Sequence, residues 1–233
     1  MGRRKRPEVV IAIRDGSRRS GVTRVVSALC DTEDVRLVCV YCGSSPGSRP
    51  EFADEARSLG RAIAEAGHGL VYGGGRIGLM GVVADAVLEA GGVVHGVIPE
   101  HLVRAETAHT GLSILDVVDS MHERKARMAE LACGFVVMPG GFGTFDEAFE
   151  ILTWNQLGLV RKPLVFLDGT GFYRPLLAAL DHVVEAGFVS TEFRRIAAVA
   201  DTAAAAVAIA TGPAPDVPGK LAALDPTTKR SSL

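Results

Sequence analysis

The chain has 233 residues, of which 48% are hydrophobic, so it has enough apolar side chain for the core of one large domain or two small ones. Lys and Arg number 25 against 27 Asp and Glu, and the formal net charge of −2 excludes the global basic field that draws proteins onto nucleic acid. Four cysteines are too few for a disulfide scaffold, and no stretch approaches the roughly 18 uncharged apolar residues of a membrane span. We therefore expect a globular, cytoplasmic protein that binds a small molecule, without nucleic acid or membrane as a partner.

The two ends of the chain differ in composition from the middle. Residues 1–34 are dense in Arg and Lys and lack a sustained apolar period, which predicts a flexible basic extension. A nucleic-acid patch is the alternative, which the absence of interleaved aromatic residues disfavours. Residues 211–233 are rich in Pro, Ser and charge and are predicted to form a flexible tail. The folded domain is expected at residues 35–210.

Within residues 35–210, short β-branched runs alternate with longer segments of helical periodicity. This alternation predicts a three-layer α/β fold, in which a parallel sheet of about seven strands has helices on both faces. The predicted strands are residues 36–42, 69–72, 93–98, 113–118, 134–138, 163–167 and 196–200. The predicted helices are residues 50–66, 78–91, 121–132, 144–158, 172–186 and 202–209.

The first predicted strand contains Cys39 and Cys42 in CxxC spacing. A redox pair or half of a metal site is one interpretation. The surrounding run VRLVCVYCGSS favours the other, a buried strand that contains two small apolar thiols.

Three glycine-bearing loops follow predicted strands, with the sequences CGSS (42–45), GGGRIG (73–78) and PGGFGT (139–144). Ligands bind parallel sheets at the carboxyl ends of the strands, and bare N–H groups at a helix start attract an anion, so a phosphate site is predicted there. GGGRIG also fits the dinucleotide pattern G-x-G-x-x-G. It follows the second strand, however, and Glu100 comes too late for a ribose, so an NAD-linked oxidoreductase is a weaker alternative, beside a simple tight turn.

The segment PGGFGTFDE, residues 139–147, has parts with separable roles. Its glycines, Gly140, Gly141 and Gly143, allow the backbone to approach an oxyanion, and Thr144 supplies a hydroxyl where the helix is expected to begin. The competing interpretation is a capping box from Thr144 to Glu147 that needs no ligand.

The helix predicted before this segment carries cations beside its inward face. At about 100° per residue, Met121, Met128 and Ala132 share one face, and Arg124 and Lys125 flank it. The opposite face is expected to be solvated and carries Glu123, Arg127 and Glu130.

Arg124 and Lys125 need an anionic partner, because an unpaired buried cation is very costly. A bound phosphorylated substrate is the favoured partner. A salt bridge to Glu147 or Glu106 is the alternative.

The motifs MHERKARM, PGGFGTFDE and TWNQLG together resemble the LOG family, the cytokinin riboside 5′-monophosphate phosphoribohydrolases. The resemblance covers residues 36–205 and includes GGGRIGLMG and KPLVFLD, but not the basic extension. It implies a Rossmann-like fold, a homodimer, and hydrolysis of N6-modified adenosine monophosphates to the free base and ribose 5-phosphate. Proteins with this motif are also labelled lysine decarboxylases, but the sequence lacks a signature for a lysine that binds pyridoxal phosphate.

By position, Arg124 and Glu147 match the catalytic pair of that family. Its substrate-contacting positions correspond to Glu106, Arg124, Lys125, Gly141, Phe142, Gly143, Thr144, Phe145, Asp146, Glu147 and Thr153. Ser44, Gly74 and Gly75 of the other two loops are further candidates for binding the substrate.

The predicted mechanism needs neither metal nor cofactor. Cleavage of an N-glycosidic bond builds positive charge on the ribose, which a carboxylate can stabilise while it activates water. Glu147, expected in the first turn of its helix, is the candidate, and Arg124 is expected to orient it and keep it ionised. A non-catalytic nucleotide sensor that uses the same loop is the alternative from another class.

Overall fold

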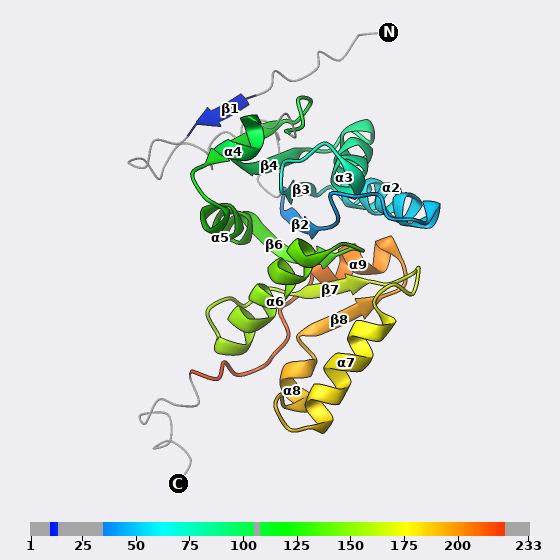
Figure 1. Cartoon of the computed structure of the whole chain (residues 1–233), viewed down its shortest axis with the longest axis vertical. Coiled ribbons are helices and arrows are strands. Elements are labelled where there is room, and N and C mark those ends of the chain that lie inside the picture. Colours follow the sequence, from blue (N-terminus) through cyan, green and yellow to red (C-terminus); the bar gives the residue numbers. More distant parts are fainter. Residues whose placement is uncertain (1–9, 14–34, 105–107, 222–233) are drawn as a thin grey trace.

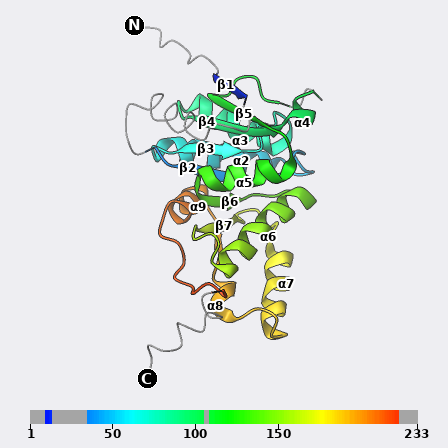
Figure 2. The ribbon, with the colours of Figure 1, turned by 90° about the vertical axis from the view of Figure 1, so that its left-hand side faces the viewer.

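The computed structural model describes residues 10–13, 35–104 and 108–221. Within these residues, eight parallel strands form one sheet in the order β1-β5-β4-β3-β2-β6-β7-β8 (Figure 1 and Figure 2). The strands are β1 (Val10–Ile13), β2 (Leu37–Tyr41), β3 (Gly69–Tyr72), β4 (Val94–Pro99), β5 (Ile114–Val118), β6 (Ala132–Val137), β7 (Leu164–Leu167) and β8 (Ala197–Ala200). The helices are α2 (Pro50–Glu65), α3 (Gly78–Glu89), α4 (Glu100–Arg104), α5 (Met121–Leu131), α6 (Phe142–Leu157), α7 (Arg174–Glu185), α8 (Thr191–Arg194) and α9 (Ala203–Ala210).

Helices cover both faces of the sheet, so the three-layer Rossmann-like prediction is confirmed. One core layer lies under α2, α3 and α9, and the other lies under α5, α6 and α7. Strand β2 shows the alternation: Val38 and Val40 face the first layer, whereas Cys39 and Tyr41 face the second. Because both faces are covered, every residue of β2 is buried, as a continuous hydrophobic run predicts. Figure 2 shows α5 and α6 lying across the second face.

The chain reverses its direction of travel across the sheet at β2. Strands β3, β4 and β5 are added in succession on one side of β2, and β6, β7 and β8 on the other. The loops after β2 and β6 therefore diverge, and a crevice opens between them at the carboxyl ends of the strands. The two loops are joined at their base, where Gly43 N–H donates to the Pro139 carbonyl at 3.0 Å.

The seven expected strands are present, and β1 is an addition. It pairs with β5, more than 100 residues away in sequence, so no local pattern could indicate it. The other residues of the predicted basic extension lie outside the described part of the chain, and its flexibility stays a prediction. In the predicted tail, residues 211–221 are described, and Lys220 N–H donates to the Gln156 carbonyl of α6 at 2.8 Å. Within the described residues, no helix is both long and apolar enough to cross a membrane.

Candidate active site

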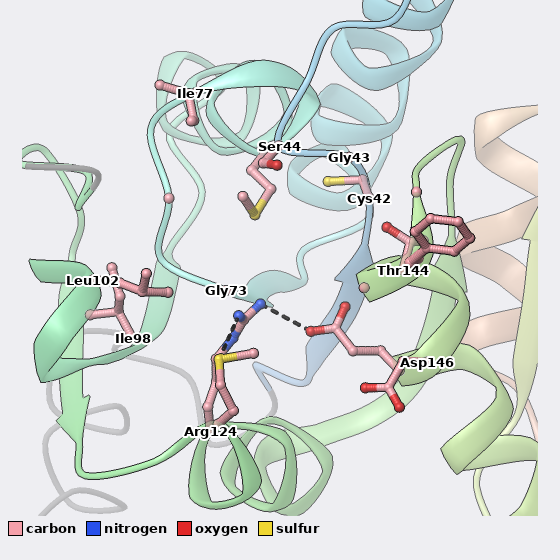
Figure 3. Close-up of a pocket in the computed structure, with 17 residues that line it drawn as sticks. Cys42, Gly43, Ser44, Gly73, Ile77, Ile98, Leu102, Arg124, Thr144 and Asp146 are labelled. Carbon is pink, nitrogen blue, oxygen red and sulfur yellow. Dashed lines mark hydrogen bonds and ion pairs between the residues drawn. The ribbon is translucent and has the colours of Figure 1, made fainter. Parts of the chain in front are cut away.

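A cavity of about 410 Å³ lies in the crevice at the carboxyl ends of β2, β3, β4 and β6. Its wall combines the three glycine-bearing loops with the starts of α4, α5 and α6 (Figure 3). The lining residues are Cys42, Gly43, Ser44, Gly73, Gly75, Ile77, Met80, Ile98, Leu102, Met121, Arg124, Gly141, Phe142, Gly143, Thr144, Asp146 and Glu147.

The cavity has an apolar side and a polar side. Ile77, Ile98 and Leu102 lie on one side, and Thr144 and Asp146 of α6 lie across from them (Figure 3). Gly73 lies between the two sides (Figure 3). Such a wall suits a ligand that has both a flat apolar part and a charged part.

Arg124 and Glu147 form a buried ion pair at the floor of the cavity. The Arg124 Nη2 donates to Glu147 Oε1 at 3.0 Å, and the two side chains are only 11% and 8% exposed. Gly73 makes this pair possible, because a Cβ on that residue would collide with the Arg124 guanidinium. The Met121 sulfur lies 3.6 Å from Arg124 Nη1 on the other side.

Burial raises the pKa of Glu147 to about 7, and the neighbouring Asp146 contributes in the same direction. Arg124 lowers this pKa but does not offset burial. The expectation that Arg124 keeps Glu147 ionised is therefore met only in part: the charge of Arg124 favours the carboxylate, but burial outweighs it and places the pKa near 7. A carboxyl that titrates near neutral pH inside a cavity is suited to taking up and releasing a proton.

Helix α6 begins at Phe142 with Gly141 as its N-cap, two residues earlier than expected. Thr144 is thus the third residue of the helix, so the capping box from Thr144 to Glu147 is wrong, and Glu147 lies in the second turn rather than the first. Glycine is an acceptable N-cap, which explains why a helix can start before the first hydroxyl residue. The first N–H groups of any helix lack an intrahelical acceptor, and here they lie at the cavity wall.

Lys125 does not line the cavity. Its Nζ lies 3.0 Å from Asp146 Oδ2 and 3.2 Å from Glu150 Oε1, both on α6. Burial alone would lower the pKa of Lys125, but its bonds to these two carboxylates raise it above its usual value. Both cations are therefore paired with carboxylates of the protein. The pairing of Arg124 with Glu147 was the expected alternative to a ligand, whereas the pairing of Lys125 with Asp146 and Glu150 was not expected.

Arg127 does not face solvent, so that prediction is wrong. It is 6% exposed, and its Nε donates to the buried Asp116 of β5 at 2.9 Å. The periodicity of α5 could not show this, because the reason for burying Arg127 is a carboxylate on a strand and not an apolar stripe.

The other candidate residues are placed as follows. Ser44, Gly75, Phe142, Gly143 and Asp146 line the cavity. Gly74 lies behind it against Ile98 with φ 72°, Phe145 packs on Tyr173, and Thr153 donates to the Phe149 carbonyl beside a second hollow between α6 and α7. Glu106 lies outside the described residues. The roles of all of these in binding stay predictions.

Sequence reasoning missed eight lining residues: Cys42, Gly43, Gly73, Ile77, Met80, Ile98, Leu102 and Met121. Most are apolar, and hydropathy does not distinguish a side chain that lines a cavity from one in the core. Gly73 was inside a motif already singled out, and only its distance to Arg124 reveals its role.

The two alternative motif interpretations find little support. The glycines of GGGRIG have packing reasons of their own: Gly73 makes room for Arg124, and Gly78, at φ 63°, lies against the Ser44 backbone. Cys39 and Cys42 belong to opposite core layers, and burial raises the pKa of both thiols above the usual range. The buried-strand interpretation of CxxC is thus confirmed for Cys39, whereas Cys42 is buried just beyond the end of β2, at the cavity wall.

Comparison with known proteins identifies the family. A family model described as "possible lysine decarboxylase" matches residues 80–209. The cytokinin riboside 5′-monophosphate phosphoribohydrolase of Rhodococcoides fascians is 49% identical over 160 residues, covering 68% of this chain and 81% of that protein. The corresponding enzyme LOG of Oryza sativa subsp. japonica is 46% identical over 168 residues, covering 72% and 69%. The chain belongs to the LOG family.

A solved structure of a protein with a different name shares this fold. The molybdenum cofactor carrier protein of Chlamydomonas reinhardtii matches with a TM-score of 0.56 and 22% identity, covering 75% of this chain and 95% of that one. At this identity the similarity concerns the fold alone.

Proposed function

We propose that this protein hydrolyses the N-glycosidic bond of adenosine 5′-monophosphates, including N6-modified ones, to give the free base and ribose 5-phosphate. The observation that carries the proposal is the buried pair of Arg124 and Glu147 on the floor of a cavity walled by glycine-loop backbone. The names of the relatives from Rhodococcoides fascians and Oryza sativa subsp. japonica support the same reaction.

The phosphate binds at the start of α6, where backbone N–H groups and the positive end of the helix dipole attract an anion. The base lies against the apolar side made by Ile77, Ile98 and Leu102. The ribose then lies between these two ends, above Glu147. A nucleoside without phosphate lacks the anchor at α6 and is expected to react poorly.

As the bond to the base breaks, the ribose becomes cationic, and the Glu147 carboxylate stabilises it electrostatically. The same carboxylate accepts a proton from the attacking water, whose oxygen forms the new bond at C1′. The proton reaches the departing base through solvent or Glu147. Arg124 holds Glu147 in place through its Nη2.

The test is to incubate the protein with AMP and with isopentenyladenosine 5′-monophosphate and to separate free base by chromatography, with adenosine as the unphosphorylated control. Release of base from the nucleotides but little from adenosine is expected. Nucleotide binding without release of base would instead indicate a sensor. Binding of NAD(H) in a titration would favour the oxidoreductase alternative.

Two further properties are part of this proposal. We expect a homodimer in the cytoplasm. Exposed apolar residues support a dimer interface: Phe149, Leu159 and Phe188 are 39%, 62% and 84% exposed. In addition, α7 has no fully buried residue within this chain. Light scattering coupled to size exclusion should give twice the mass of the chain. A monomer at all concentrations would contradict this.

The label of the family model suggests a second reaction, the decarboxylation of lysine. Among the described residues that line the cavity there is no lysine that could form a Schiff base with pyridoxal phosphate. We expect no CO₂ release from lysine in the presence of pyridoxal phosphate.

A further inference from the structure

A second polar cluster lies beneath α5, outside the cavity. Asp116 of β5 is fully buried, and its Oδ2 accepts from Arg127 Nε at 2.9 Å and lies 3.1 Å from His95 Nε2 of β4. The three side chains are at most 7% exposed. The Arg127 Nη1 also donates to the exposed Glu130 at 2.8 Å.

A gain in stability does not explain why this cluster is buried. Removing two charges from water costs several kcal/mol per ion, and replacing such a pair by neutral residues of similar size is often neutral or stabilising. Asp116 Oδ1 and Arg127 Nη2, moreover, have no hydrogen-bond partner among the described residues. In some proteins a buried ion pair is retained because it fixes a geometry that an apolar contact leaves free.

The geometry that it fixes is that of α5. Only two of the five buried residues of this helix, Met128 and Ala129, are apolar, and the others are Arg124, Lys125 and Arg127. Apolar attraction is non-directional, so two apolar side chains restrict the rotation of a helix about its axis less than a hydrogen-bonded ion pair does. The rotation of α5 is thus set on the sheet side by Arg127 and Asp116.

Arg124 lies three residues before Arg127, so any rotation of α5 moves it directly. Its guanidinium has little room, because the Gly73 backbone lies against it while Nη2 reaches Glu147. A small rotation would separate Arg124 from Glu147 or press it into the loop after β3.

We propose that Asp116 and Arg127, together with His95, are positioning residues that hold Arg124 against Glu147. They touch neither the cavity nor the reacting atoms and act only through α5. The predicted loss of turnover rests on the proposed function, whereas the predicted loss of the contact between Arg124 and Glu147 does not.

The test uses the full chain with Asp116→Asn and Arg127→Met combined, which removes both charges and leaves an amide oxygen available to His95. We expect kcat for base release to fall about tenfold to a hundredfold, as a displacement of about 1 Å costs, while KM and the melting temperature change little. The control is Asp54→Asn combined with Arg57→Met, an exposed ion pair at 2.8 Å on α2. It should keep the wild-type kcat.

Arg127→Lys keeps the positive charge, so we expect it to retain more turnover than the double variant. Unfolding of the double variant alone would not explain such a graded loss. A double variant with wild-type kcat, or one whose kcat falls only as its melting temperature falls, would overturn the inference. If the wild-type protein itself releases no base, the proposed function fails, and a crystal structure decides the inference separately. In the double variant, the contact of Arg124 with Glu147 should be lost; if it is retained at 3.0 Å, the inference fails.

Discussion

At the scale of single residues, Glu147 is where burial and charge oppose each other. Its pKa of about 7 results from a desolvation that Arg124 only partly offsets. Sequence reasoning identified both residues through a motif and a helical face, but the ionisation of Glu147 depends on how completely the two are buried. The burial of Arg124 and Glu147 depends on how α5 and α6 are placed on the sheet, which no local sequence pattern indicates.

The ionised form of Glu147 stabilises positive charge, and its pKa lies near 7, so kcat/KM should rise as the pH increases through about 7 and then level off. The phosphate of a nucleotide substrate also titrates near this range. Asp146→Asn separates the two, because Asp146 raises the pKa of Glu147, and its removal should shift the midpoint to lower pH. A midpoint that stays in place in this variant would assign the pH profile to the substrate.

Glu147→Gln keeps the size of the side chain but removes its charge. Nucleotide binding measured by calorimetry should persist, and turnover should fall by about 10²–10⁴-fold, the usual contribution of a general acid or base. Glu150→Gln is the matched control, because that carboxylate lies one turn along the same helix and outside the cavity lining. An active Glu147→Gln variant would leave Glu147 with a structural role only.

At the scale of elements, periodicity predicted seven strands and the longer helices, because those features repeat along the chain. It failed for Arg127 and for the start of α6. In the first case the partner, Asp116, is on another element, and in the second a glycine takes the N-cap position that a hydroxyl usually fills. The sequence predicted the glycine-rich loops and suggested that they bind an anion. It could not predict which side chains from distant elements hold these loops in place.

Tyr173 is one such side chain. It is fully buried before α7, and its hydroxyl donates to the Met138 carbonyl at 2.5 Å, directly before the loop that starts α6. Tyr173→Phe removes only that hydroxyl and leaves a buried carbonyl with one bond fewer. The free energy of unfolding, measured with urea, should fall by about 1–3 kcal/mol. An unchanged value would mean that this bond contributes nothing net.

At the scale of the whole molecule, the cavity residues all come from positions 42–147, whereas the sheet extends well beyond them on both sides. The strand β1 pairs with the outer edge of β5, and neither strand contributes a residue to the cavity lining. An unpaired edge strand exposes backbone N–H and C=O groups, whereas pairing adds hydrogen bonds to the sheet. Composition alone indicated a flexible extension here, because pairing with a distant strand is a long-range property.

Deleting residues 1–34 tests the two descriptions of this segment. If β1 contributes to the sheet, the melting temperature should fall by roughly 2–8 °C, as about 1–2 kcal/mol would do in a chain of this size, and turnover at 25 °C should be retained. A purely flexible extension predicts no change in melting temperature. Loss of turnover in a truncated protein that is still folded would link the segment to the site.

Gly73 has a consequence for how the protein tolerates mutation. It has no functional group, yet the path of the Arg124 guanidinium passes through the space that any side chain at position 73 would fill. Gly73→Ala should therefore reduce kcat while leaving most of the sheet intact, as near-ultraviolet circular dichroism and a kinetic assay can show together. In a saturation mutagenesis scored by activity, position 73 should be as intolerant as position 147. Activity would then depend on the absence of a Cβ atom at position 73 as strictly as on the presence of the carboxylate at position 147.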